Sequence, residues 1–287
     1  MKTFDTPQPI EVRLELGVGH VRITAADRPS TVVSVQPSDP AKQGDVSAAE
    51  QTRVDFSGGR LVIKGPRGLR QWAPWRGRES VDVDIELPEG SRLGGETGVV
   101  DLHATGRLGD VDFTTGIGQV DMDRAGAFRV RSGVGDIGAA EVSGPVDART
   151  GTGRIDIGRA DASVVVKNSN GDTSIGDASG ELRVQSANGA ISVGRSRSSV
   201  VAKSAMGNIR IDTVTAGSVV AQTGYGQIDV GILAGVPAWL DLQTGLGQVR
   251  RELDGSAEPS PGENTAEVRA STGMGNITIR RSAGVPA

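Results

Sequence analysis

The sequence predicts an all-β protein: a single-chain β-solenoid of about nine to ten coils, with an N-terminal strand-rich cap. Two observations predict this fold. A glycine motif recurs with a period of about 18 residues, and apolar residues alternate with polar ones around each motif. The composition agrees, because 42 glycines and only 3% aromatic residues suit a thin aliphatic core with many tight turns.

The repeat is marked by the second glycine of motifs such as "TGIGQVDM" at residues 115–122. Successive marker glycines lie 17, 18, 18, 18, 18, 19, 21 and 28 residues apart. A sustained period of this length is typical of solenoids, in which each repeat stacks on a neighbour. The markers are Gly118, Gly135, Gly153, Gly171, Gly189, Gly207, Gly226, Gly247 and Gly275.

The positions around each marker predict two short strands per coil. Apolar residues stand seven and five before the marker and two and four after it, apart from a few positions such as Arg251. This alternation indicates strands with one buried face. Three before the marker stands Ser or Thr, except at Asn168, and we expect this row to face inward and to bond neighbouring coils. We expect each coil to rest on the one before it in the chain, with extra corners at Gly158, Gly176, Gly194 and Gly231.

The glycine motif is interpreted as a turn and not as a ligand site. Glycine permits the positive φ that a tight corner requires. A calcium-binding β-roll places aspartate two residues after the second glycine, where this chain has Val or Ile, and Asp121 comes one residue later. No strand-to-helix transition follows the glycines, so a dinucleotide-binding fingerprint is excluded as well.

The chain is predicted to divide at about residue 95. Residues 1–95 form a β-rich cap that includes a first coil around Gly19, with further strands at 31–35, 53–56, 60–63 and 81–87. Residues 39–51 are expected to form a surface loop. Residues 96–281 form the solenoid repeats, and residues 282–287 form a flexible tail.

One segment is unlike the rest of the chain. "GPRGLRQWAPWRGR" (65–78) holds four arginines, two tryptophans and no acidic residue. Arginine offers several planar donors to an anion and tryptophan a stacking face, so the segment is the best candidate for a ligand-binding site. The alternative is a hairpin loop whose tryptophans cover the solenoid end. The candidate binding residues are Arg67, Arg70, Trp72, Trp75, Arg76 and Arg78.

Other constellations of chemistry-bearing residues are weak. His20 and His103 fall in different coils without obvious metal-ligand companions. The outward aspartates Asp121, Asp156 and Asp229 do not form a continuous strip, because Ser, Gly and Arg occupy the same position in other coils. The sequence therefore predicts no enzyme, no catalytic residue, no metal site and no cofactor.

Charge and processing signals limit the partners and the location. With 31 basic and 35 acidic residues, the balanced charge argues against nucleic-acid binding. No cysteine is present, which excludes disulfides and thiolate sites. No apolar run reaches the ~18 residues of a transmembrane helix, and the first residues show no signal-peptide pattern, so a cytoplasmic location is expected.

Three stretches carry a family resemblance. "VKNSNGDTSIGDASGELRVQSANGAISV" (166–193), "AWLDLQTGLGQV" (238–249) and "GMGNITIRR" (273–281) resemble a bacterial domain-of-unknown-function family labelled "putative adhesin" or β-strand-repeat protein. The resemblance extends from residue 4 to residue 281. It implies a β-solenoid and no established enzyme activity or catalytic residues.

Three classes of function follow. The preferred hypothesis is a non-catalytic binding or scaffold protein that presents its solenoid faces and the Arg/Trp segment to a protein or anionic partner. The first alternative is a structural protein that assembles itself end to end into filaments. The second is a carbohydrate-active β-helix enzyme, which the broken carboxylate strip disfavours.

Overall fold

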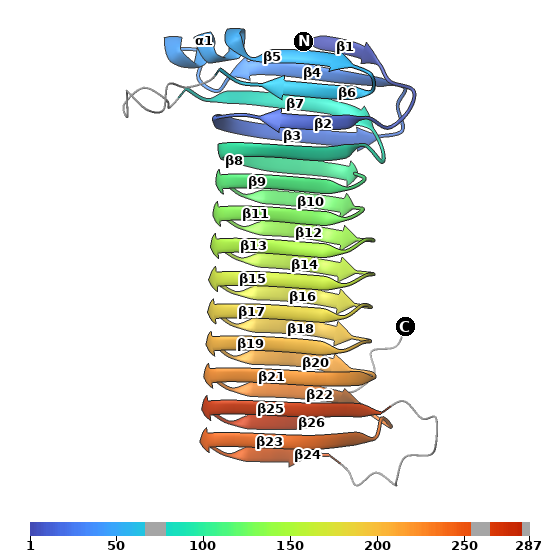
Figure 1. Ribbon diagram of the computed structural model, residues 1–287, viewed down its shortest axis with the longest axis vertical. Helices are drawn as coiled ribbons and strands as arrows, with labels where there is room; N and C mark the ends of the chain where they lie inside the picture. The colour runs from blue at the N-terminus through green and yellow to red at the C-terminus, as the bar shows by residue number, and fades with distance from the viewer. Residues whose placement is uncertain (67–78, 254–264, 283–287) are drawn as a thin grey trace. The chain divides into compact units, whose positions relative to one another are not determined.

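The computed structural model describes residues 1–66, 79–253 and 265–282. The chain divides into two compact units, Met1–Ala140 (unit 1) and Glu141–Ala287 (unit 2). Parallel strands wound into coils dominate both units, so the prediction of an all-β solenoid with an N-terminal strand cap is confirmed (Figure 1). Among the described residues, no helix is long and apolar enough to cross a membrane.

Unit 1 contains twelve strands and a helix within the described residues, although its last strand runs past residue 140. They are β1 (Lys2–Asp5), β2 (Glu11–Glu15), β3 (Val18–Ala26), β4 (Ser30–Pro37), α1 (Gln43–Gln51), β5 (Arg53–Ser57), β6 (Arg60–Lys64), β7 (Val81–Pro88), β8 (Arg92–Arg107), β9 (Val111–Ile117), β10 (Val120–Ala125), β11 (Phe128–Val134) and β12 (Ile137–Val142).

The long strand β8 joins two sheets of unit 1. One sheet runs β1–β4–β7–β3–β8–β10 and the other β5–β6–β2–β8–β9–β11. The pairings of β8 with β2, β3, β9 and β10, and of β9 with β11, are parallel, as stacked coils require. Strands β1, β4 and β5 pair antiparallel with their neighbours and form the strand cap.

The expectation of a surface loop at residues 39–51 is wrong, because most of this segment forms helix α1. The helix is anchored by Asp45, which is only 3% exposed. Its carboxylate accepts hydrogen bonds from the backbone N–H of Ser80 at 3.0 Å and of Asp39 at 3.2 Å. A carboxylate in the first turn also suits the helix dipole. A helix this short has a weak periodic signal, which is why the sequence pattern missed it.

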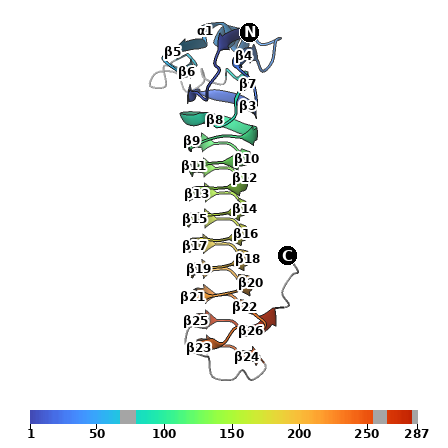
Figure 2. The same cartoon turned by 90° about the vertical axis from the view of Figure 1, so that its right-hand side faces the viewer.

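Unit 2 consists of coils with two strands each (Figure 2). Its strands are β13 (Val146–Thr152), β14 (Ile155–Ala160), β15 (Val164–Asn170), β16 (Thr173–Ala178), β17 (Leu182–Asn188), β18 (Ile191–Ser196), β19 (Val200–Met206), β20 (Ile209–Val214), β21 (Gly217–Tyr225), β22 (Ile228–Leu233), β23 (Ala238–Leu246), β24 (Val249–Glu252), β25 (Ala266–Met274) and β26 (Ile277–Ser282).

The coils of unit 2 do not stack in the order of the chain. Strands β25 and β26 pair with β21 and β22 on one side and with β23 and β24 on the other. The coil of β23 and β24 therefore lies at the end of the stack, and the expectation that every coil rests on the preceding one is wrong there (Figure 1). Arg251 accounts for the exchange, since it stays exposed in the end coil at the position where Ile279 is fully buried in the neighbouring coil.

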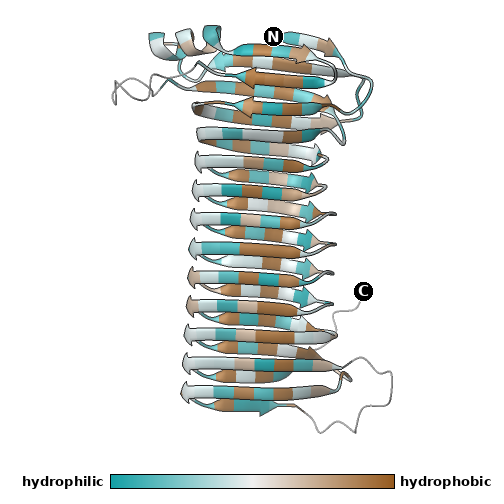
Figure 3. Cartoon of the chain, in the orientation of Figure 1, coloured by the Kyte–Doolittle hydropathy of each residue, from teal (hydrophilic) through white to brown (hydrophobic). Residues whose placement is uncertain are grey.

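The core of the coils is a thin layer made mostly of aliphatic side chains, with Phe113 and Phe128 among its largest members. Hydrophobic and hydrophilic positions alternate along the strands (Figure 3). The inward Ser and Thr row is confirmed. Ser132 donates to the carbonyl of Gly118 and Thr272 to that of Gly226, each in the adjacent coil. Asn168 substitutes for the hydroxyl by donating to the carbonyl of Gly153 at 2.9 Å.

The marker glycines are corners, as predicted. Gly189 has a φ of +140°, and a Cβ there would lie 2.1 Å from the carbonyl oxygen of Gly171. The glycines five residues after the marker, which were expected to form extra corners, do not all lie at corners. Gly176 and Gly194 lie inside β16 and β18, so their interpretation as corners is wrong. A Cβ on Gly194 would lie 2.4 Å from the oxygen of Gly176, so close approach of neighbouring coils selects glycine there.

Candidate binding surfaces

The six candidate residues of the Arg/Trp segment lie within 67–78, outside the described residues. Their assignment as a ligand-binding site stays a prediction. The described residues form two other candidate surfaces. One is a pocket on unit 1, and the other is a row of exposed apolar side chains at the coil corners.

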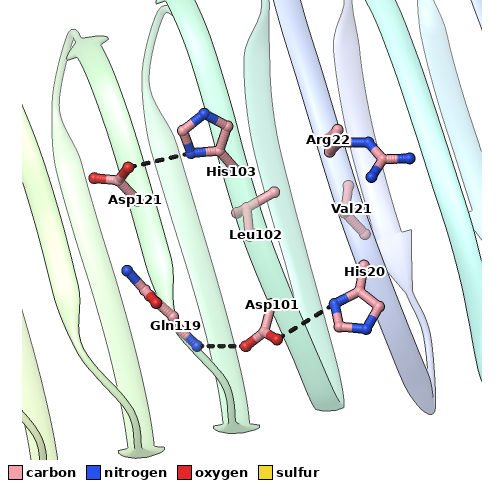
Figure 4. A pocket seen from close by; sticks show the side chains of 8 residues that line it. All are labelled: His20, Val21, Arg22, Asp101, Leu102, His103, Gln119 and Asp121. Carbon is pink, nitrogen blue, oxygen red and sulfur yellow. Dashed lines mark hydrogen bonds and ion pairs between the residues drawn. The ribbon is translucent and has the colours of Figure 1, made fainter.

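The pocket of unit 1 brings the two histidines of the chain together (Figure 4). His20 on β3 lies directly opposite Asp101 on β8, and His103 on β8 lies opposite Asp121 on β10. The Nδ1 atom of His20 is 3.3 Å from Oδ2 of Asp101, and Nδ1 of His103 is 3.1 Å from Oδ2 of Asp121. The two histidines therefore share one pocket, and each of them pairs with a single aspartate of a neighbouring strand.

The remaining lining residues hold this arrangement in place. The backbone N–H of Gln119 donates to Oδ1 of Asp101 at 2.8 Å. Arg22 donates from Nε to Asp84 on β7 at 2.6 Å. This hydrogen bond, with the negative charge of Asp84, raises the pKa of Arg22. The pocket is consequently a charge-paired outer face of the three neighbouring strands β3, β8 and β10.

The chemistry available to the pocket is limited. Each histidine and its aspartate are about half exposed, so solvent screens the pairs. In the described part of the chain, no three residues among His, Cys, Asp and Glu are placed to hold a metal ion. No Ser or Cys nucleophile lines the pocket. The pocket is thus a solvent-exposed surface whose histidines and aspartates are paired with one another.

The sequence contained a signal for only one of the two pairs. His103 and Asp121 are separated by 18 residues, which is the repeat period, so the template aligns them on neighbouring strands. His20 and Asp101 are separated by the strands of the cap, and their pairing depends on how the cap folds. The repeat pattern cannot predict that contact.

The second surface is formed by the residue that immediately precedes each marker glycine. In unit 2, strand pairing places Met206, Tyr225, Met274 and Leu246 side by side on four neighbouring strands. Their exposed fractions lie between 46% and 65%. We call these four residues the apolar row. In unit 1 the same position holds Val99, Ile117 and Val134, which are also exposed.

Polar residues occupy the same corner position elsewhere in unit 2. Thr152, Asn170 and Asn188 lie opposite one another on β13, β15 and β17. Asn188 donates from Nδ2 to Oδ1 of Asn170 at 2.9 Å. The corner geometry therefore accepts Thr and Asn, so the turn itself does not require the apolar side chains of the apolar row.

The outward position three residues after the marker carries aspartate in some coils and other residues in others. Within unit 2, Asp156 lies opposite Ser174, and Ser192 lies opposite Arg210. Asp229 accepts a hydrogen bond from Arg280 at 2.9 Å. Serine and arginine therefore interrupt the acids at this position.

Comparison with known proteins identifies the family. The model of the family described as "Toastrack DUF4097" matches residues 11–280. The chain belongs to the toastrack DUF4097 family. The resemblance noted in the sequence is thereby confirmed, and the toastrack match spans the strands from β2 to β26. No curated protein matches this toastrack chain.

Three solved structures are similar to the toastrack chain. A "putative cell adhesion protein" from Clostridium sporogenes is 14% identical over 98% of both chains, with a TM-score of 0.27. A "putative adhesin" from Bacteroides fragilis is 10% identical over 97% of this chain and 95% of that one, with a TM-score of 0.38. A "putative lipid binding protein" from Parabacteroides distasonis is 14% identical with the same coverage, and its TM-score is also 0.38.

Proposed function

We propose that this toastrack chain is a non-catalytic binding protein that holds a protein partner against its solenoid surface. The observation that carries the proposal is the apolar row of unit 2, in which four large apolar side chains stand exposed on neighbouring strands. Contiguous exposed apolar surface is typical of interaction sites, whereas single exposed apolar residues are ordinary.

The composition and spacing of the apolar row suit a protein partner. Neighbouring strands lie about 4.8 Å apart, so four strands give a straight row of about 14 Å. Methionine and tyrosine are enriched at the centres of protein interfaces, and methionine adapts its shape to a partner. The residues two before the marker are Ala205, Gly224, Gly245 and Gly273, which leave the larger side chains prominent.

The experiment replaces two members of the apolar row, Met206 and Tyr225, by asparagine, which the chain already has at this corner position in other coils. We would compare the wild type with M206N/Y225N in affinity capture from a lysate of the source organism. The matched control is T152N, which places the same amide at the polar part of the corner. A partner retained by the wild type and T152N but lost by a folded M206N/Y225N supports the proposal. Equal recovery with all three chains would contradict it.

The Arg/Trp segment is retained as a second proposed contact, supported by its sequence. Its arginines and tryptophans suit an anionic or aromatic partner surface. The quadruple variant R70A/W72A/W75A/R76A, captured beside the wild type, tests it separately. Loss of a partner that M206N/Y225N retains would assign that partner to the segment. Unchanged recovery would remove the segment from the proposed function.

A further inference from the structure

The end coil of unit 2 exposes an unpaired strand edge. Strand β23 pairs with β25 and, among the described residues, with no other strand. Its side away from β25 therefore presents backbone N–H and C=O groups without a strand partner. Such an edge is a template for a further strand, and natural proteins generally block it or use it.

The same coil leaves apolar surface unburied. Leu240 and Leu242 are only half-buried, although Val268 and Ala270, opposite them on β25, are at most 2% exposed. Trp239 is 57% exposed, and its ring lies 5.8 Å from the guanidinium carbon of Arg269. Leu246, at the end of β23, is the most exposed member of the apolar row. Pairing along β23 would cover this surface.

We propose that the β23 edge binds the β23 edge of a second copy of this chain, antiparallel and centred on Leu242. In that register Trp239 faces Gly245 of the second copy, and Asp241 faces Gln243. A large aromatic ring over a cross-strand glycine is a favourable pair, and the Gln243 amide can donate to the Asp241 carboxylate. No like charges meet, because Asp241 is the only charged residue of β23.

Two further features select this mode of pairing over others. Strand β24 has four residues and carries Arg250 and Arg251, so pairing β24 with its own copy would bring like charges together. A symmetric contact between two like edges is self-complementary and stops at two copies, whereas head-to-tail stacking would continue. The inference shares only Leu246 with the apolar row, and the test of the proposed function uses Met206 and Tyr225, so each can fail without the other.

The main test is the mass of the full chain by analytical ultracentrifugation, over a concentration series reaching about 100 µM. We expect a dimer for the wild type. Q243D places a second aspartate opposite Asp241 and should weaken dimerisation about tenfold or more. The matched control Q222D changes the equivalent exposed position of β21, an interior strand, and should leave the dimer unchanged.

A charge exchange keeps the test valid if Q243D alone perturbs the coil. In D241K/Q243D a lysine at position 241 faces an aspartate at position 243 of the second copy, at both symmetric positions. The opposite charges attract, so dimerisation should return. A monomeric wild type over the whole series would overturn the inference. So would a dimer that Q243D leaves unchanged, or a mass that grows beyond two copies.

A cysteine variant reads the register directly, since the chain has no cysteine of its own. L242C places two thiols at the proposed symmetry axis, where a disulfide can bridge facing strands. The control L240C faces Thr244 of the second copy and should link poorly. Efficient disulfide formation by L242C and not by L240C supports the register, and equal linkage or none would overturn it.

Discussion

The Thr223 hydroxyl donates a hydrogen bond to the Gly207 carbonyl oxygen at 2.9 Å, joining one coil of unit 2 to its neighbour. Thr244 makes the same bond to Gly275, also at 2.9 Å. The donor stands three residues before one marker glycine, and the acceptor is the marker glycine of the adjacent coil. The corner motif thus combines two residues: a Ser, Thr or Asn whose side chain donates the hydrogen bond, and a marker glycine with positive φ.

Removing the hydroxyl should loosen this link between coils. We expect T223V, which keeps the shape of the side chain, to lower the free energy of unfolding by about 1 kcal/mol. The control is T152V, at an exposed corner position, where the change should stay below about 0.5 kcal/mol. Urea unfolding followed by circular dichroism measures both, and equal losses in the two variants would contradict the role of the bond.

A side chain at a marker glycine should be costly. Gly189→Ala places a Cβ 2.1 Å from the Gly171 carbonyl oxygen in a backbone conformation with φ of +140°. Backbone strain and the clash together should cost about 3 kcal/mol or more. Gly17→Ala is the control, because no atom lies within 4 Å of its added Cβ. Similar melting temperatures for both variants would refute the close approach of neighbouring coils at this corner.

The two faces of a strand should respond differently to substitution. Ile191 is fully buried, and Ile191→Asp would place a carboxylate in a thin apolar core at a cost of several kcal/mol. Asp156 is exposed on the outer face, so Asp156→Ala should change the free energy of unfolding by less than about 0.5 kcal/mol. Denaturant unfolding distinguishes them, and an unaffected Ile191→Asp would mean that the inward assignment is wrong.

Acid should weaken one contact of the cap. The ammonium group of Lys64 on β6 hydrogen-bonds to the Glu15 carboxylate on β2 and lowers the pKa of Glu15. Because the folded-state pKa is depressed, the contribution is present above the unfolded pKa and is lost as pH falls through the folded value. Both side chains are about one-third exposed, so we expect less than about 1 kcal/mol.

The variant Glu15→Gln tests this pH dependence. The difference in unfolding free energy between the wild type and Glu15→Gln should be present at neutral pH and shrink towards zero in acid. Urea unfolding at a series of pH values measures it. A difference that stays constant across the series would show that the charge of Glu15 contributes nothing.

Some contacts of the candidate surfaces can be predicted from the repeat in the sequence, and others depend on the tertiary fold. The pairing of His103 with Asp121 follows from the repeat period, and so does the apolar row, once the residue before each marker is compared across coils. The pairing of His20 with Asp101 depends on the route of the cap strands, which no periodic pattern describes. The exposure of β23 depends on which coil lies at the end of the stack.

The sequence by itself determined the coil: its period, its inward and outward positions, its glycine corner and its hydroxyl row. These features are local, since strand alternation and turn geometry act within about 18 residues. Only the tertiary structure decided the order of the coils. Strands β25 and β26 lie between two earlier coils because Ile279 can be buried at the position where the end coil has Arg251. Burying the unpaired charge of Arg251 between two coils would cost free energy, and this cost favours the observed order of the coils.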